Sequence, residues 1–154
     1  MKKLNLKKII QNNSIRHKYI IDKEIESGLV LQGWEIKSIR SKKVVIDNSY
    51  ISIHNKEAYI YNSIFQTQLA GDNIIHNPAR IRKLLLNKHE LLFLKEKISN
   101  YQYTAVVLSL FWKNSWIKAN IGLGKGIKKY DKRNILNKNQ WKNEKTYITK
   151  YCNK

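Results

Sequence analysis

The chain has 154 residues, of which 30 are Lys or Arg and 11 are Asp or Glu, giving a formal net charge of +19. This length allows one domain with a core of its own, and the charge is typical of proteins that bind nucleic acid. The single cysteine, Cys152, excludes an intrachain disulfide. No apolar run reaches the ~20 residues of a membrane span and no signal peptide is visible, so we expect a cytosolic protein.

In the first third of the chain, β-type patterns follow a polar start. Residues 1–16 are polar and basic, and we expect a flexible arm there. Two apolar runs, Tyr19–Ile21 and Gly28–Leu31, flank the polar residues 22–27, and we interpret them as a hairpin with a polar connection. The segment Glu35–Arg40 places two isoleucines at helical spacing and predicts one or two helical turns.

The middle of the chain predicts a second hairpin and then helix. Residues 48–53 and 57–61 alternate in character across a short polar turn, as two paired strands do. Leu69–Pro78 is expected to be a loop, with Pro78 suited to the entry of a helix. Residues 80–98 follow a helical period that Asn87 can divide into two helices.

The last part of the domain predicts a pair of strands. Tyr103–Trp112 is the strongest strand in the sequence, and Lys113-Asn114 turns it into Ser115–Ile121. Three glycines, at positions 122, 124 and 126, are expected to end the strand region.

These elements predict a mainly β protein built on a small antiparallel barrel of six strands. No strand–helix–strand pattern repeats, so the strands should be antiparallel, and closure into a barrel removes exposed strand edges. Among small barrels that bind nucleic acid, the OB type fits best. The expected organisation is a flexible N-terminus over 1–16, the barrel over 17–124 and a basic tail over 125–154.

The tail carries ten Lys or Arg residues against two acids, Asp131 and Glu144. Its apolar content is too low to offset the entropy lost on ordering, so we expect it to be flexible when free. If residues 134–151 become helical on a partner, Trp141, Ile148 and Tyr151 share one face. A partner of opposite charge is expected, and because 25 of the 30 basic residues are Lys, phosphate contacts are favoured over base reading.

Enzyme chemistry finds little support in the sequence. The acids Asp22, Glu24 and Glu26 cluster, but in a predicted hairpin connection where charge is expected for solubility. The four histidines lack metal-ligand spacing, and the glycine-rich stretch at 122–126 lacks the Walker spacing. We therefore expect no catalytic residue, no metal and no cofactor. Arg16 and His17 are instead expected to lie next to RNA.

Four short motifs stand out along the chain. Residues 16–19 read Arg-His-Lys-Tyr, and residues 33–40 read Gly-Trp-Glu-Ile-Lys-Ser-Ile-Arg. Residues 77–86 read Asn-Pro-Ala-Arg-Ile-Arg-Lys-Leu-Leu-Leu, and residues 130–133 read Tyr-Asp-Lys-Arg. In this order the motifs resemble those of the SsrA-binding protein family, the small protein B of trans-translation, and the resemblance runs from about Asn12 to the C-terminus. Two departures are Ile127, where the family usually has Lys, and Asn77 in place of Asp.

What the resemblance implies is an OB-type barrel with six antiparallel strands and about three short helices. The family binds the tRNA-like domain of transfer-messenger RNA (tmRNA, or SsrA RNA) and brings it to stalled ribosomes, without catalytic activity. Its tail enters the decoding centre and the empty messenger channel. The RNA-binding positions implied here are Arg16, His17, Glu35, Lys37, Arg40, Arg80, Arg82, Lys83, Leu85, Asn87, Lys125, Lys128 and Lys129. The ribosome-contacting tail positions are Tyr130, Asp131, Lys132, Arg133, Trp141 and Ile148.

The sequence therefore predicts a non-enzymatic RNA-binding adaptor of ribosome rescue, a monomer when free. The main alternative is a structural ribosomal protein or a general RNA-binding protein on the same barrel. A small basic nuclease is disfavoured because no acid–base or metal constellation is visible.

Overall fold

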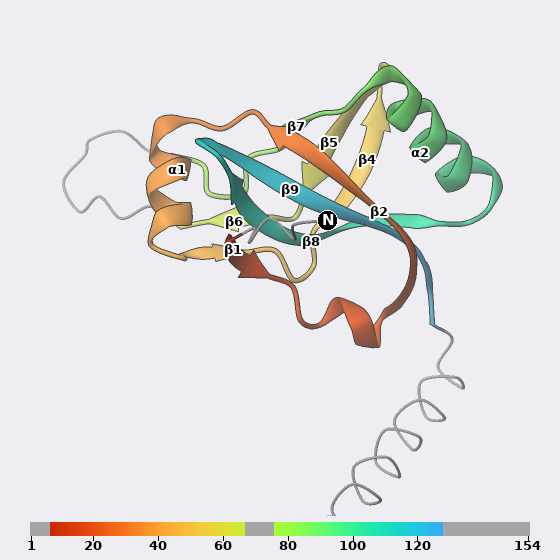
Figure 1. The fold of residues 1–154 in the computed structure, drawn as a ribbon, viewed down its shortest axis with the longest axis horizontal. Coiled ribbons are helices and arrows are strands. Elements are labelled where there is room, and N and C mark those ends of the chain that lie inside the picture. The colour runs from red at the N-terminus through yellow and green to blue at the C-terminus, as the bar shows by residue number, and fades with distance from the viewer. Residues whose placement is uncertain (1–6, 67–75, 128–154) are drawn as a thin grey trace, which may run out of the picture.

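The structure of the chain is a computed structural model that describes residues 7–66 and 76–127. Figure 1 shows strands gathered in the middle of the molecule, with the two α-helices at opposite ends of the strand layer. In chain order the elements are β1 (Lys7–Gln11), the 3-10 turn η1 (Ile15–His17), β2 (Tyr19–Leu29), α1 (Gly33–Arg40), β3 (Val44–Val45), β4 (Tyr50–His54), β5 (Glu57–Tyr61), β6 (Ile64–Phe65), β7 (Arg82–Leu85), α2 (Lys88–Asn100), β8 (Thr104–Lys113) and β9 (Trp116–Gly126).

Six of these strands close into a barrel. The order β8-β4-β5-β7-β2-β9 returns to β8 through the β8–β9 pairing, and every pairing is antiparallel. Closure leaves few free strand edges in a small domain. Strand β1 pairs with the end of β8 that β4 leaves free. The expected six-stranded antiparallel barrel is confirmed.

The barrel is filled by alternating apolar side chains, and the helices close its ends. Val107 of β8 and Ile121 of β9, which are register partners on neighbouring strands, are completely buried. Leu94 of α2 is completely buried in the same core. From α1, Ile39 is completely buried and Trp34 is 9 % exposed. Burying one such side chain contributes about 1.5–3 kcal/mol, so these contacts fix both helices against the strands. No helix among the described residues is long and apolar enough to cross a membrane.

Strand β2 corrects the first predicted hairpin. Residues 19–29 form one continuous strand, paired with β9 along almost its whole length. The polar run that suggested a turn is the outer face of this strand, because Ile25 and Ser27 point inward and are buried while Glu24 and Glu26 are exposed. Alternation with period two explains the charges, which need no turn.

The second predicted hairpin is confirmed. Strands β4 and β5 pair from Tyr50 opposite Tyr61 to His54 opposite Glu57. The two turn residues, Asn55 and Lys56, have φ angles of 49° and 61°. Positive φ at both central positions is the geometry that matches the twist of a two-residue hairpin.

The helix predicted over residues 80–98 is correct only in its second half. Residues 82–85 form β7, with Leu84 in the core and Leu85 on the outside. Asn87 then stands at the N-cap of α2, where the Glu90 carboxylate accepts the Asn87 backbone N–H at 2.9 Å. This capping box starts the helix at Lys88, so the apolar residues before it belong to a strand.

The glycines of β9 do not end the strand. A Cβ atom on Gly124 would lie 2.3 Å from the backbone oxygen of Ile20, and one on Gly122 would lie 2.8 Å from the Leu108 side chain. Glycine therefore allows neighbouring strands to approach closely, and β9 continues to Gly126.

The N-terminal boundary is corrected in the same way. Residues 7–11 form β1, and Asn12 is buried, with its side-chain amide donating to the backbone oxygen of Ile46 at 2.9 Å. Ile15 in η1 is also buried. Residues 7–16 are thus part of the domain, because one buried amide and one buried isoleucine fix them to it.

Candidate nucleic-acid interface

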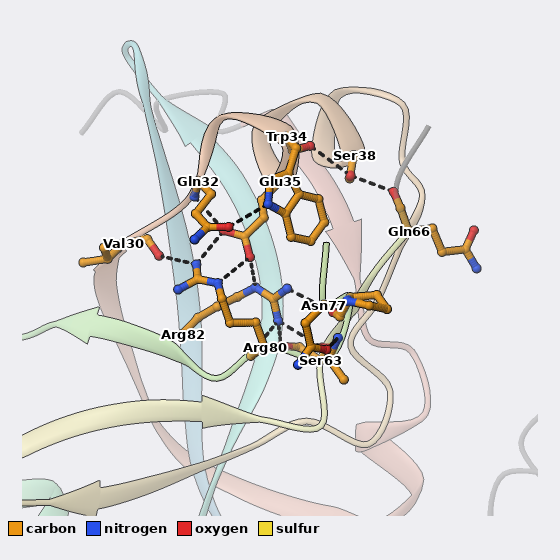
Figure 2. A network of polar contacts seen from close by, with 12 residues as sticks. Val30, Gln32, Trp34, Glu35, Ser38, Ser63, Gln66, Asn77, Arg80 and Arg82 are labelled. Carbon is orange, nitrogen blue, oxygen red and sulfur yellow. Dashed lines mark hydrogen bonds and ion pairs between the residues drawn. The ribbon is translucent and has the colours of Figure 1, made fainter. Parts of the chain in front are cut away.

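A buried carboxylate organises the segment around α1. Glu35 is completely buried, and its carboxylate accepts hydrogen bonds from the backbone N–H of Gln32 (2.6 Å), from Arg80 Nη2 (2.7 Å) and from Arg82 Nε (2.7 Å) (Figure 2). The first bond is part of a capping box at the N-terminus of α1. The other two join the helix to the chain leading into β7.

Arg82 is the second centre of this network. Its guanidinium is also completely buried and donates to the backbone oxygens of Ser63, Arg80 and Pro78 at 2.6–3.0 Å. It lies 3.7 Å from the centre of the Phe65 ring. Burial lowers the pKa of Arg82 from its ordinary value, while Glu35 opposes the shift. The guanidinium remains charged because its partner is a carboxylate in direct contact.

Glu35 and Arg82, both expected to contact RNA, are completely buried, and their hydrogen bonds hold neighbouring residues in place. Arg80, the exposed member of the network, has 29 % of its side chain accessible. Lys37 and Arg40 are exposed on α1, and Arg40 lies 5.8 Å from the Trp112 ring. Lys37 and Arg40 of α1 and the partly exposed Arg80 are therefore cations that a ligand at this end could reach.

A groove at the other end of the barrel holds two more predicted residues. It has a volume of about 730 Å³ and runs between β2, Lys118 of β9 and the junction of β7 with α2. Leu85 and Asn87 line it, and Leu85 is 55 % exposed. An exposed leucine at the edge of a groove is available for contact with a ligand.

Gly28 explains how Leu85 reaches this groove. The two residues are register partners in β2 and β7, and a Cβ atom on Gly28 would lie 3.2 Å from the Leu85 Cβ. A larger residue would press on Leu85 and displace it. Asn87 is held next to it by the capping box of α2. Strand register and helix cap thus fix both groove residues.

The groove carries both signs of charge. Lys23 and Lys118 supply cations, and Glu24, Glu26 and Glu90 supply carboxylates. Glu24 accepts from the Asn120 amide and Glu26 from Lys113, each at 2.6 Å, so their side chains are held in place. Lysine suits phosphate, while a carboxylate accepts from base amino groups or ribose hydroxyls. The arrangement fits a folded polynucleotide better than a bare anion.

The remaining predicted residues lie elsewhere on the surface. Arg16 and His17 are exposed on η1, and Arg16 borders a second cavity of about 300 Å³. Lys83 pairs with Glu57 on the outside of β7 and β5, and this hydrogen bond lowers the pKa of Glu57 and raises the pKa of Lys83. Lys125 is exposed near the end of β9. Lys128, Lys129 and all the tail positions, Tyr130 to Arg133, Trp141 and Ile148, lie outside the described residues.

Sequence reasoning missed several residues of the groove. They share the outer face of β2 and β9 or the first turns of α2: Lys23, Glu24, Glu26, His89, Phe93 and Lys118. The period-two alternation over residues 24–27 places Glu24 and Glu26 on the outer face of a strand, a pattern that is easily mistaken for a polar turn. Nothing in the linear order brings Lys118 beside them, since this requires the β2–β9 register.

Within residues 7–66 and 76–127, no group of three or more His, Cys, Asp or Glu side chains could hold a metal ion. The carboxylates of the groove are engaged by Lys113, Asn120 and the cap of α2. The described surface offers positioned hydrogen-bonding groups and cations.

Two comparisons with known proteins bear on this interface. A family model described as SmpB protein matches residues 9–151. A solved structure described as "tmRNA-SmpB: a journey to the center of the bacterial ribosome" has a chain 34 % identical to this one, with a TM-score of 0.65. The match covers 78 % of this chain and 85 % of that chain.

Proposed function

This chain belongs to the SmpB protein family, and from that membership we propose that it binds the tRNA-like domain of tmRNA and delivers it to stalled ribosomes. It is an RNA-binding adaptor of trans-translation and not an enzyme. The observation that carries this conclusion is the match of the family over residues 9–151, together with a solved relative described as tmRNA-SmpB in the ribosome. The proposed place of action is the cytoplasm, and the proposed free state is a monomer.

The groove is the proposed contact with the folded RNA. Leu85 supplies an exposed apolar surface, and Asn87 lies beside it at the start of α2. Glu26 and Lys118 face the same groove from β2 and β9. Recognition of folded RNA depends on shape, hydroxyl groups and unstacked bases, and a groove with donors, acceptors and an apolar residue suits these features.

The α1 end is a proposed second RNA contact. Lys37 and Arg40 are exposed there and Arg80 is partly exposed, and Glu35 and Arg82 hold Arg80 and the helix in place. Arg16, His17 and Lys83 are proposed as further phosphate contacts. Lys83 pairs with Glu57 in the free protein and would exchange this carboxylate for a phosphate of the RNA. Helix α2, whose first turns line the groove, and helix α1 lie at opposite ends of the strand layer (Figure 1).

The segment after β9 is the proposed link to the ribosome. Ile127, which departs from the family's usual lysine, donates its backbone N–H to the Lys18 oxygen at 2.9 Å and lines the second cavity. We propose that Ile127 anchors the tail to the barrel, and that Lys125, Lys128 and Lys129 contact RNA beside this anchor. Tyr130, Asp131, Lys132, Arg133, Trp141 and Ile148 are the proposed contacts with the decoding centre and messenger channel. The proposed division is then a domain to Ile127 followed by a basic tail.

A binding comparison tests the proposed function against the alternative of a general RNA-binding protein. We predict that the chain binds the tRNA-like domain at least about tenfold more tightly than an unstructured RNA of equal length. Leu85→Ala should reduce this affinity about fivefold or more, because it removes the apolar contact of the groove. Leu92→Ala, which removes a leucine 63 % exposed on α2 outside the groove, is the matched control and should change little.

The contrary result is equal affinity for the two RNAs, which would favour a general RNA-binding protein. Equal losses for Leu85→Ala and Leu92→Ala would argue against the groove as the contact. Both affinities are measured at one stated salt concentration, because phosphate contacts make every such value depend on salt.

A further inference from the structure

Three lysines meet three aromatic rings where α2 packs beside the barrel. Lys23 Nζ lies 4.1 Å from the centre of the Phe93 ring, and Lys125 Nζ lies 4.9 Å from the centre of the Tyr103 ring. Lys97 Nζ lies 4.4 Å from Tyr101 and within 6.0 Å of both Phe93 and Tyr103. Lys97 and Lys23 thus both lie near the Phe93 ring, and Lys97 and Lys125 both lie near the Tyr103 ring. We name these six residues the lysine–aromatic seam.

The cations of the seam are unneutralised in the part of the chain that the structure describes. No described carboxylate lies within ion-pair distance of Lys23, Lys97 or Lys125. Lys83 and Lys113, by contrast, each pair with a glutamate. The acid beside the seam, Asp22, accepts the hydroxyl of Tyr103, and this bond raises the pKa of Tyr103. Among the described residues, the three cations of the seam therefore have no ion-pair partner.

The rings limit where the ammonium groups can go. An ammonium over an aromatic face is attracted by the ring, and its lysine stem lies along apolar surface. Such a lysine still has donors directed away from the ring. Because its position is already restricted, it loses less conformational freedom when an anion binds. Three lysines held in this way form a preorganised site for neighbouring phosphates.

The seam is continuous with the groove. Lys23 and Phe93 belong to both, so the surface extends from Leu85 and Asn87 along α2 to Lys125. The two parts differ in charge, since the groove includes Glu24, Glu26 and Glu90. The groove suits bases and riboses, whereas the seam suits consecutive phosphates.

We propose that the lysine–aromatic seam binds the sugar-phosphate backbone of the RNA whose folded part occupies the groove. This inference rests on the proposed function and adds to it a backbone contact made by Lys23 and Lys97, which none of the motifs contains. Lys125 joins the same contact from β9. The seam therefore extends the proposed RNA contact beyond the groove, toward Lys125.

The test compares two triple variants that carry the same net charge. One replaces Lys23, Lys97 and Lys125 with Gln, and the control replaces the exposed lysines Lys43, Lys56 and Lys95 with Gln. Lys95 lies on α2 like Lys97, so the helix charge changes equally. Binding to the tRNA-like domain of tmRNA is measured between about 50 and 200 mM salt, and thermal unfolding checks that both variants fold as the wild type does.

We expect the seam variant to bind about tenfold or more weakly than wild type, with a salt slope smaller by about two to three. The control should change the slope by less than one. Tyr101→Leu keeps every charge but removes one ring face, so it should weaken binding a few-fold with the slope unchanged. Lys97→Gln alone should cause more loss than Lys95→Gln.

The outcome separates failure of this inference from failure of the proposed function. If the wild-type chain does not prefer the tRNA-like domain to unstructured RNA, the proposed function fails. If it does prefer that domain, but the seam variant keeps wild-type affinity and slope or loses no more than the control, the seam is not a backbone contact.

Discussion

At the scale of single residues, Glu35 and Arg82 form the centre of a buried hydrogen-bond network. The Glu35 carboxylate caps α1 and holds Arg80 and Arg82, and Arg82 in turn bonds the backbone of the segments around β6 and β7. A buried charge is tolerated only when partners surround it. Glu35, Arg80 and Arg82 therefore serve first to hold α1 against the barrel.

Glu35→Gln tests this structural role. The substitution keeps the shape but leaves the buried Arg82 cation without its counter-charge, so we predict a loss of about 3 kcal/mol in the free energy of unfolding. Lys37→Gln, an exposed change on the same helix, should stay within about 0.5 kcal/mol of wild type. Urea denaturation of both variants measures the difference. A fully stable Glu35→Gln variant that binds RNA weakly would instead make Glu35 a direct RNA contact.

Single residues also show which parts of the candidate site can be predicted from the sequence. The motifs identified Leu85 and Asn87, which the structure places together in the groove. They did not separate buried from exposed charges, because Glu35 and Arg82 look no different in sequence from Lys37 and Arg80. Their burial depends on contacts between residues 45 and 47 positions apart. Such pairing cannot be recognised from local spacing.

At the scale of elements, the strongest local patterns predicted the structure well. The β4–β5 hairpin and strand β8 have clear alternation and were predicted correctly. Errors occurred where a tertiary contact overrides the local pattern. The outer charges of β2 resembled a turn, and the glycines of β9 resembled a strand end, because only the closed barrel requires a polar outer face and close strand approach.

The glycines of β9 give a graded prediction. Gly124→Ala places a Cβ 2.3 Å from a backbone oxygen, which cannot move aside, so we expect a loss of about 3 kcal/mol or more. Gly122→Ala meets the side chain of Leu108, which can shift, so the loss should be smaller. Gly33→Ala meets nothing within 4 Å at the start of α1 and should be neutral or slightly stabilising.

Chemical denaturation of the three variants checks this order. If Gly124→Ala were as stable as Gly33→Ala, β9 would not pack against β2 as described. Loss of RNA binding without loss of stability in Gly124→Ala would give this glycine a role at the RNA surface instead.

At the scale of the whole molecule, the protein combines a closed barrel with a basic tail. The barrel presents the groove and the seam along α2, and Arg80 with its neighbours at the α1 end. The described residues end at Ile127, whose backbone N–H donates to the Lys18 oxygen, and the proposed tail follows it. Two RNAs must be held at once in the proposed function, and separate surfaces allow this. Of the net charge of +19, a large part belongs to the tail.

The tail can therefore be removed without cutting the barrel. A chain ending at Ile127 keeps all of β9 and its bond to Lys18, so it should fold and retain most of its affinity for the tRNA-like domain. Because the proposed decoding-centre contacts are gone, it should not support peptide tagging on stalled ribosomes. Loss of RNA affinity and tagging together would argue against a division between barrel and tail.

The central claim is that this chain is the adaptor through which tmRNA rescues stalled ribosomes. The most direct measurement uses purified components lacking any other such adaptor, with ribosomes stalled on a message that has no stop codon. Adding the full-length chain together with tmRNA should attach the tmRNA-encoded tag to the stalled peptide, and omitting either one should abolish tagging. If tagging proceeds equally without the chain, or fails although the chain binds tmRNA tightly, the protein is not this adaptor.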